Sequence, residues 1–363
     1  MNELSQVSVV LPSLDPDEKL HGVIQGLIAE GFDDIILVND GSKPENLHYF
    51  EEAAALTQVH VLHHPYNRGK GAALKTAFSW FLEHRPDRAG VVTVDGDGQH
   101  HRADTAACAR HMLNAGKITL GVRDFSQPDV PWRSKNGNQI TSFVFKTFVG
   151  MTISDTQTGL RAFPANLLPL LCEVAGDRFE YETNMLLCMK SEELPFDEVK
   201  IRTVYIEENK SSHFRAVRDS WRIYKLILAH FFRYTLSSLV CFVVDEGLFV
   251  LLSMLLRPYL AGFVLTAIPT AIARVISSVF NFFVNKRLVF HAKGNTGRSL
   301  LRYYALALPI ALAQIVLTHG VYALFQITPA QIFLRALIYA VVMVSLFIAS
   351  FLVQQRWVFK KQK

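Results

Sequence analysis

The chain has 363 residues, half of which are hydrophobic, and its formal net charge is +5. This length suits two domains, and the hydrophobic share is high for a protein that is soluble throughout. The four scattered cysteines lack CxxC spacing, so we expect a reduced compartment and exclude a structural zinc site.

Residues 1–212 alternate between strand-like and helical segments. Apolar runs predict strands at 7–12, 34–40, 59–64, 91–97 and 118–123, and helices at 18–30, 45–56, 69–84 and 103–115 separate them. This alternation predicts an α/β domain with a mostly parallel, Rossmann-like sheet. The first residues lack the basic and apolar regions of a signal peptide, so we do not expect secretion by that route.

Polar residues lie at the carboxyl ends of the predicted strands, where ligands bind in such sheets. The stretch VVTVDGDGQHH (91–101) places Asp95 and Asp97 one residue apart at a strand end. Two such carboxylates can hold one divalent cation, which completes its shell with water and substrate phosphates. A simple turn is the alternative for this pattern. Pro12, Asp40 and Arg123 are expected at the same edge of the sheet.

The stretch NRGKGAALKTA (67–77) is glycine-rich and opens a helix. It is neither a Walker A loop nor a GxGxxG motif. Two interpretations stay open: the glycines allow tight packing, or they let the backbone approach a nucleotide at a helix N-terminus.

Two segments are candidates for helices that lie in a membrane interface. Residues 213–232 mix Arg and Lys with Trp, Tyr and Phe, which favours this interpretation over a packed helix. For residues 138–150 the two interpretations stay equally open.

Residues 233–363 are predicted to form a membrane domain with helices at 233–256, 260–284, 302–326 and 332–354. Basic residues flank one side of these helices and predict that both termini and the first domain are cytoplasmic. They are Arg215, Arg218, Arg222, Lys225, Arg233, Lys286, Arg287, Lys293, Arg298, Arg302, Arg356, Lys360, Lys361 and Lys363, against Arg257 and Arg335 near the opposite side. Because they follow the membrane edges, a nucleic-acid-binding function is excluded.

The membrane half shows an internal repeat. FRYTLSS (232–238) aligns with LRYYALA (301–307), and FFVNKRLVF (282–290) aligns with FLVQQRWVF (351–359) at the same offset, which suggests two related hairpins. Within the apolar region Asp245 is expected to contact Arg274 as a structural pair rather than as part of a transport path.

Seven motifs together resemble the family 2 glycosyltransferases of the GT-A fold. They are VVLPSLDPDE, ILVNDGS, NRGKGAA, DGDGQH, GVRD, DTQTGLRAF and the basic stretch that follows. The chain is most similar to polyprenyl- and dolichyl-phosphate monosaccharide synthases, and residues 233–363 resemble the GtrA-like four-helix domain that some of these carry.

The resemblance implies roles for individual residues. The nucleotide would contact Pro12, Leu14, Asp15, Asp40, Gly69, Lys70 and Asp95; the metal, Mg²⁺ or Mn²⁺, would bind Asp95, Asp97 and Gln99. Catalysis would use Asp97, Arg123 and Arg133; the acceptor phosphate would meet Arg133, Lys210, Ser212, His213 and Arg215; and the acceptor loop would contain Asp155, Thr158, Gly159 and Arg161.

Three of the family's motifs are altered in this chain. LDPDE replaces an Asn-Glu pair, so Asp15, Asp17 or Glu18 would make the first acidic contact. Asn39 replaces one acid of Asp-Asp-Gly-Ser, and EENKSSHF replaces the basic loop Arg-x-x-Gly-x-Ser-Lys.

The implied reaction is an inverting transfer of one sugar from a UDP- or GDP-linked donor to a polyprenyl phosphate at the cytoplasmic membrane face. A homo-oligomer is possible within this interpretation. A processive polysaccharide synthase is one alternative, although the QQRW sequence (354–357) is one residue short of the QxxRW signature and follows the last helix. A lipid-sugar translocase with an inactive transferase domain is another, and the intact Asp95 and Asp97 argue against it.

Overall fold

The computed structural model describes residues 2–125, 130, 132–202, 225, 228–260, 262–290, 292, 294–328 and 331–359. The chain divides into two compact units, Met1–Leu226 and Ile227–Lys363.

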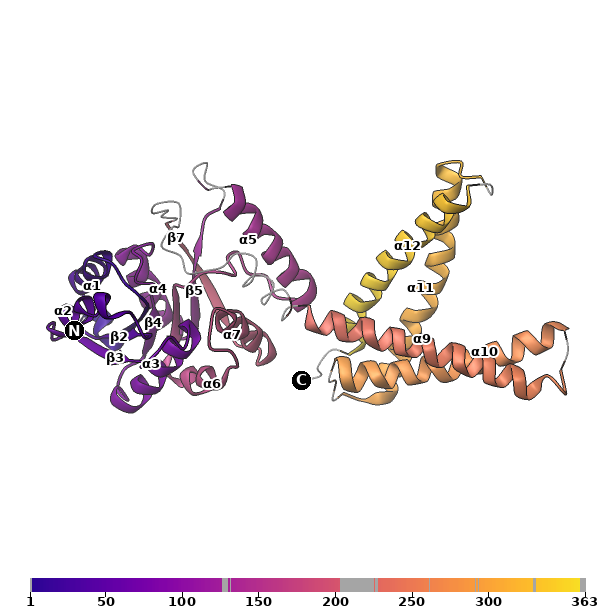
Figure 1. The fold of residues 1–363 in the computed structure, drawn as a ribbon, viewed down its shortest axis with the longest axis horizontal. Helices are drawn as coiled ribbons and strands as arrows, with labels where there is room; N and C mark the ends of the chain where they lie inside the picture. Colours follow the sequence, from indigo (N-terminus) through magenta and orange to yellow (C-terminus); the bar gives the residue numbers. More distant parts are fainter. Residues whose placement is uncertain are drawn as a thin grey trace. The chain divides into compact units, whose positions relative to one another are not determined.

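The first unit is built on a seven-stranded sheet in the order β3-β2-β1-β4-β6-β5-β7 (Figure 1). The strands are β1 (Val7–Ser13), β2 (Ile35–Asn39), β3 (Val59–His63), β4 (Gly90–Thr93), β5 (Ile118–Arg123), β6 (Arg161–Pro164) and β7 (Phe196–Ile201). All neighbours are parallel except β6, which runs antiparallel between β4 and β5. The five predicted strands are present, and the predicted α/β class with a mostly parallel sheet is confirmed.

Helices cover both faces of this sheet. They are α1 (Lys19–Glu30), α2 (His48–Ala54), α3 (Lys70–His84), α4 (Arg102–Ala115), α5 (Trp132–Val144), α6 (Leu168–Glu173) and α7 (Glu180–Ser191). Alternate residues of a strand point to opposite faces. Val7, Val9 and Leu11 of β1 share one core cluster with buried residues of α1 and α4. On the other face α3 packs on β1 and β2, and α6 and α7 pack against α3. Strands β1 and β2 are almost completely buried.

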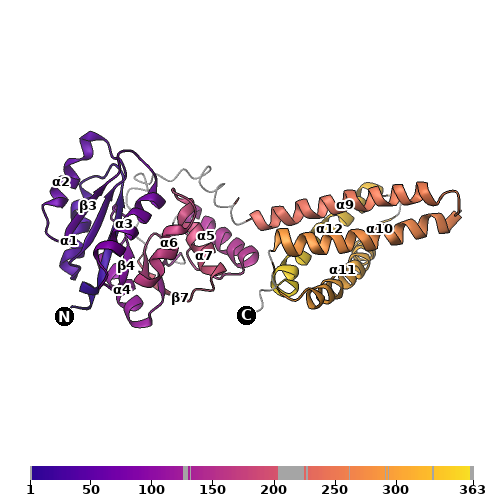
Figure 2. The same cartoon turned by 90° about the horizontal axis from the view of Figure 1, so that it is seen from below.

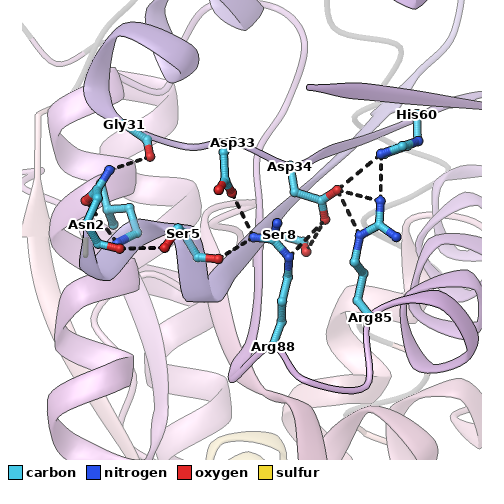
Figure 3. A network of polar contacts seen from close by, with 10 residues as sticks. Asn2, Ser5, Ser8, Gly31, Asp33, Asp34, His60, Arg85 and Arg88 are labelled. Atoms are coloured by element: carbon cyan, nitrogen blue, oxygen red, sulfur yellow. Dashed lines mark hydrogen bonds and ion pairs between the residues drawn. The ribbon is translucent and has the colours of Figure 1, made fainter. Parts of the chain in front are cut away.

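A polar network fastens the end of the sheet at which β1 and β2 begin (Figure 3). Asp34 is buried just before β2, and the Arg85 side chain, just after α3, donates from Nε (3.0 Å) and Nη2 (2.9 Å) to its Oδ1. Ser8 donates to the other carboxylate oxygen of Asp34, and Arg88 bridges to Asp33 at 2.9 Å. Asp40 follows the carboxyl end of β2, where ligands are expected. The network around Asp34 therefore supports the fold at the opposite end of the sheet from Asp40.

The second unit contains four long apolar helices, α9 (Ala229–Leu256), α10 (Gly262–Val284), α11 (Thr296–Leu324) and α12 (Ile332–Val353). Helices α9 and α10 lie side by side as one hairpin, and α11 and α12 form a second (Figures 1 and 2). By length and composition, four spans can cross a membrane: Phe231–Leu256, Ala267–Val289, Thr296–Leu324 and Ile332–Val358. The protein is therefore an integral membrane protein.

The two hairpins end in the same way, as the sequence repeat suggested. Each closes with a π-helical turn, η6 (Asn285–Val289) and η7 (Gln354–Val358). Asn285 and Gln354, 69 residues apart, occupy equivalent positions, and Asn285 Nδ2 donates to Gln354 Oε1 at 3.3 Å. The rings of Phe290 and Phe359, also equivalent, stack at 5.0 Å. The QQRW sequence therefore lies in the π-helical turn that closes the second hairpin, equivalent to the turn that closes the first.

A second set of contacts relates the hairpins in both directions. Tyr234 of the first hairpin bonds to Ser350 of the second (3.4 Å), and its equivalent Tyr303 accepts a bond from Asn281 of the first (3.2 Å). Asn281 and Ser350 are again equivalent positions in the repeat. The two hairpins therefore meet around an approximate two-fold axis.

The acid and base expected to pair within the apolar helices are in contact. Arg274 Nη2 of α10 lies 3.1 Å from Asp245 Oδ2 of α9. Ser277 donates to the other oxygen of Asp245 at 2.7 Å. Asp245 is buried and its charge is matched, as a charged group at this depth requires.

Candidate active site

The loops after β1 and β2 are tied together through Asp15. Its backbone has φ 47°, which is unusual for a residue other than glycine. Its amide donates to Ser42 Oγ (2.8 Å), and its Oδ1 accepts from the Lys43 amide (2.8 Å). Pro12 pairs with Val38 inside the sheet, and Leu14 follows directly after β1. These contacts fix the rim of the sheet on which a nucleotide is expected.

Asp40 anchors the glycine-rich turn that opens α3. Its buried carboxylate accepts the backbone amides of Arg68 (2.9 Å) and Gly69 (2.8 Å), and His64 Nδ1 lies 2.7 Å from it. Asp40 therefore holds the start of α3 through this loop.

The glycines of this turn are required by space and by backbone geometry. Gly69 has φ 105°, and a Cβ there would overlap the Asp177 carbonyl. A Cβ on Gly71 would overlap Tyr181. Of the two interpretations of the NRGKGAA stretch, tight packing is the one that these contacts support.

Lys70, between those glycines, reaches the acidic loop after β4. Its Nζ lies 2.7 Å from Asp95 Oδ1 and 3.0 Å from Glu182 Oε1 of α7. Burial alone would lower the pKa of Lys70, but the two carboxylates raise it above its usual value. Burial would likewise raise the pKa of Asp95, but the Lys70 charge outweighs it and lowers the pKa to about 2. The pair is therefore fully ionised at neutral pH.

Asp97 and His100 complete the acidic loop. Strand β4 ends at Thr93, so Asp95 and Asp97 lie in the loop beyond it and not in the strand itself. Asp97 Oδ1 accepts the Gln99 amide (3.0 Å), and burial together with the charge of Asp95 raises the pKa of Asp97. His100 Nδ1 accepts the Asp95 amide (3.2 Å), and burial lowers the pKa of His100.

This donor set fits a hard divalent cation. Asp95 and Asp97 offer carboxylate oxygens, and their mutual repulsion is relieved by a bound cation. Among the described residues, no three His, Cys, Asp or Glu side chains gather as a metal cluster. Such a two-carboxylate site suits Mg²⁺ or Mn²⁺ that also binds water and phosphate oxygens.

The loop before β6 closes over Asp95. A Cβ on Gly159 would overlap the Asp95 carboxylate, with Oδ2 as its nearest atom, so a larger residue there would displace that carboxylate. Thr158 Oγ1 donates to the Gly121 carbonyl at 2.5 Å and fixes this loop to β5.

Arg123, expected to face phosphates, and Arg161, expected in the acceptor loop, both bond to other parts of the protein. Arg123 Nε donates to Oδ2 of the fully buried Asp155 at 2.7 Å. Arg161 is buried and donates to the carbonyls of Thr158 (2.9 Å) and Glu182 (2.8 Å). The structure thus brings Lys70, Asp95, Asp97, Gln99, Arg123, Asp155, Thr158, Gly159 and Arg161 to one end of the sheet.

Glu182 was not selected from the sequence, because one acid among the polar residues of a helix usually faces solvent. Only its proximity to Lys70 in three dimensions marks it. Lys210, Ser212, His213 and Arg215 lie outside the described residues, as does the side chain of Arg133, so their assignments stay predictions.

Comparison with known families defines the class of both units. Residues 8–166 match the family described as glycosyl transferase family 2, and residues 233–359 match the GtrA/DPMS transmembrane domain. The chain is a family 2 glycosyltransferase. More particularly, a GtrA/DPMS transmembrane domain is fused to this transferase domain, and curated relatives of the chain are polyprenyl-phosphate sugar transferases.

Two curated relatives illustrate this group. UDP-N-acetylglucosamine–dolichyl-phosphate N-acetylglucosaminyltransferase of Methanococcus voltae is 28% identical over 219 residues, covering 55% of this chain and 86% of the relative. Polyprenol monophosphomannose synthase of Mycolicibacterium smegmatis is 26% identical over 210 residues, covering 55% and 77%.

Among solved structures, one similar chain is glucosyl-3-phosphoglycerate synthase from Mycobacterium tuberculosis in complex with Mn²⁺, uridine diphosphate and phosphoglyceric acid. Its TM-score is 0.44 at 14% identity, with 56% of this chain and 72% of that chain covered.

Proposed function

We propose that this protein transfers one sugar from a nucleotide diphosphate sugar to a polyprenyl phosphate at the cytoplasmic face of the membrane, with inversion at the anomeric carbon. The observation that carries the proposal is the acidic loop with Asp95 and Asp97 at the ligand-binding end of a family 2 transferase domain. Four candidate membrane spans follow this domain in the same chain, which suits an acceptor whose tail stays in the bilayer.

The residues around the acidic loop divide the work on the donor. Asp95 and Asp97 would hold Mg²⁺ or Mn²⁺, which neutralises charge on the departing nucleotide diphosphate when bound. Asp15 and Asp40 fix the loops on which the nucleotide rests. Gly159 leaves the space in which Asp95 sits.

The acceptor needs positive charge more than it needs a base. A phosphate monoester has a second pKa of about 6, so it is largely dianionic at neutral pH and can attack without a dedicated general base. The dianion must approach an anionic donor, so cationic groups have to hold it. Arg133, Lys210, Ser212, His213 and Arg215 are our proposed contacts for this phosphate.

Helix α5 supports an active site that faces the bilayer surface. Trp132, Ile140 and Phe143 are 74%, 55% and 65% exposed, and their spacing places them on one helical face. Apolar side chains in this arrangement suit burial among lipid headgroups and acyl chains. We propose that α5 lies in the membrane interface, which is the interpretation that the sequence left open for residues 138–150.

The test is a donor panel with purified full-length protein, Mg²⁺ or Mn²⁺ and radiolabelled UDP- and GDP-sugars. We expect one donor to label polyprenyl phosphate. The matched control acceptor is the corresponding polyprenol, which has the same tail without the phosphate and should stay unlabelled. If no donor labels the phosphorylated lipid, the proposed function is wrong.

A further inference from the structure

We propose that Lys70 is a resident counter-ion that competes with the divalent cation for Asp95, so that the cation must displace Lys70 in order to bind there. This inference rests on the proposed cation site at Asp95 and Asp97. It assigns Lys70 and Glu182 as positioning residues for that site.

Lys70 lies directly against one carboxylate oxygen of Asp95. Lys70 Nζ lies 2.7 Å from Oδ1, and the other oxygen, Oδ2, lies against Gly159 without room for a Cβ. Only 18% of the Lys70 side chain is exposed, so the pair is largely shielded from water. A cation that binds Asp95 through Oδ1 therefore has to take the place that Lys70 Nζ now holds.

Glu182 gives Lys70 a second position. Its Oε1 is 3.0 Å from the same Nζ, and its side chain is only 15% exposed. A buried lysine that loses its single acid is strongly destabilised, but a lysine shared between two acids keeps a partner when one is taken. Glu182 thus makes the displacement of Lys70 from Asp95 possible at low cost.

The other buried cation nearby is held differently. Arg161 bonds through Nε and Nη1 to the carbonyls of Thr158 and Glu182, and none of its described bonds goes to a carboxylate. The guanidinium is therefore fixed by backbone, whereas the contacts of Lys70 Nζ within the described residues are with side chains. The carboxylates of Asp95 and Glu182 contact this movable ammonium group, and the charge of Asp97 acts on Asp95. The acids leave negative charge for a divalent cation to neutralise.

Direct titration with Mn²⁺ alone tests this inference without any measurement of activity. Free Mn²⁺ is followed by electron paramagnetic resonance as it is added to the full-length protein in detergent, in the absence of nucleotide. We expect Lys70→Met to bind Mn²⁺ at least about tenfold more tightly than the unaltered protein, because Asp95 is left as a partly buried anion without the Lys70 charge beside it. Lys70→Arg keeps the competing charge and should restore weak binding.

Two further variants test whether Glu182 assists Mn²⁺ binding and whether the change in affinity is specific to Lys70. Glu182→Gln should weaken Mn²⁺ binding several-fold, because a displaced Lys70 then has no second carboxylate. Lys75→Met is the matched control. Lys75 lies on the same helix, but its Nζ pairs with Asp177 (3.0 Å) and not with a residue of the acidic loop. Its Mn²⁺ affinity should not change.

The possible outcomes separate this inference from the proposed function. If Lys70→Met binds Mn²⁺ no more tightly than the unaltered protein, or if Glu182→Gln binds it more tightly, Lys70 does not compete with the cation. If Lys70→Met does not fold, as judged by circular dichroism, the Mn²⁺ affinity of Glu182→Gln decides the matter: weaker binding supports competition by Lys70, and unchanged or tighter binding contradicts it. If the protein and all variants bind no Mn²⁺, with or without UDP or GDP, the cation site itself is wrong.

Discussion

At the scale of single residues, the acidic loop provides carboxylates that can bind a cation, and a neighbouring residue sets the position of one of these carboxylates. Asp97 has a raised pKa because it is largely buried beside the charge of Asp95, and a bound cation would favour its ionised form. Gly159 contributes no chemistry, but its missing side chain sets where the Asp95 carboxylate lies.

Asp97→Ala should lower product formation at least about 100-fold, because the loss of a ligand to a Lewis-acid cation removes several kcal/mol of transition-state stabilisation. Insertion into the membrane should not change. Transfer to lipid is measured in membranes that contain equal amounts of protein. Asp87→Ala, on an exposed turn after α3, is the control and should be fully active. Normal turnover by Asp97→Ala would remove the cation from the mechanism.

Gly159→Ala should lower activity at least about tenfold while the protein stays folded, since the new methyl group overlaps the Asp95 carboxylate and displaces it. Gly22→Ala is a matched control, because a Cβ on this α1 glycine meets nothing within 4 Å. That control should keep its activity and gain about 0.5–1 kcal/mol of stability from helix propensity. Equal activity of the two variants would contradict the steric role of Gly159.

The sequence predicts the residue types that do chemistry at this site better than it predicts which of their charged side chains pair with one another. Asp95 and Asp97 stand out because two acids one residue apart at a strand end are distinctive. The partners of Lys70 could not be predicted, because Glu182 follows Lys70 by more than a hundred residues on a separate helix. Arg123 was expected to face phosphates, and its bond to the buried Asp155 depends on a loop whose conformation no local pattern encodes.

At the scale of secondary structure, the sequence pattern predicts strands β1–β5 and the long helices but not strands β6 and β7. Strands β1 and β2 are buried on both faces and therefore form apolar runs. Strand β6 has only four residues and contains the buried Arg161. Strand β7 lies at the sheet edge and carries Asp197, Glu198 and Lys200, so neither strand has an apolar run to mark it.

The repeat in the membrane domain also gives a prediction at this scale. Asn285 is fully buried, accepts a bond from Ser237 (2.8 Å) and donates to Gln354 of the other hairpin. Asn285→Leu should therefore cost about 1 kcal/mol of stability, a typical value for polar contacts between membrane helices.

Thermal melting in detergent checks this expectation. Leu288→Ala changes an exposed residue of the same π-helical turn and should leave the melting temperature nearly unchanged. Melting of Asn285→Leu at the unaltered temperature would show that the polar junction does not hold the hairpins together.

At the scale of the whole molecule, basic residues beside the helices predict that the transferase domain faces the cytoplasm. In a background with the four cysteines replaced by serine, Tyr259→Cys places one thiol in the exposed turn between α9 and α10. A membrane-impermeant maleimide should label it in intact cells. Asp87→Cys in the transferase domain should be labelled only after permeabilisation. The reverse pattern would invert the proposed orientation.

The mass of the lipid product after prolonged incubation with the full-length protein tests the central claim most directly. The reaction contains polyprenyl phosphate, the donor identified in the panel and Mg²⁺ or Mn²⁺, and a parallel reaction contains excess EDTA. The account predicts a single product heavier than the acceptor by one sugar residue, and none with EDTA. Products that carry a ladder of several sugars, or equal product formation with EDTA, would contradict cation-dependent transfer of one sugar to the lipid phosphate.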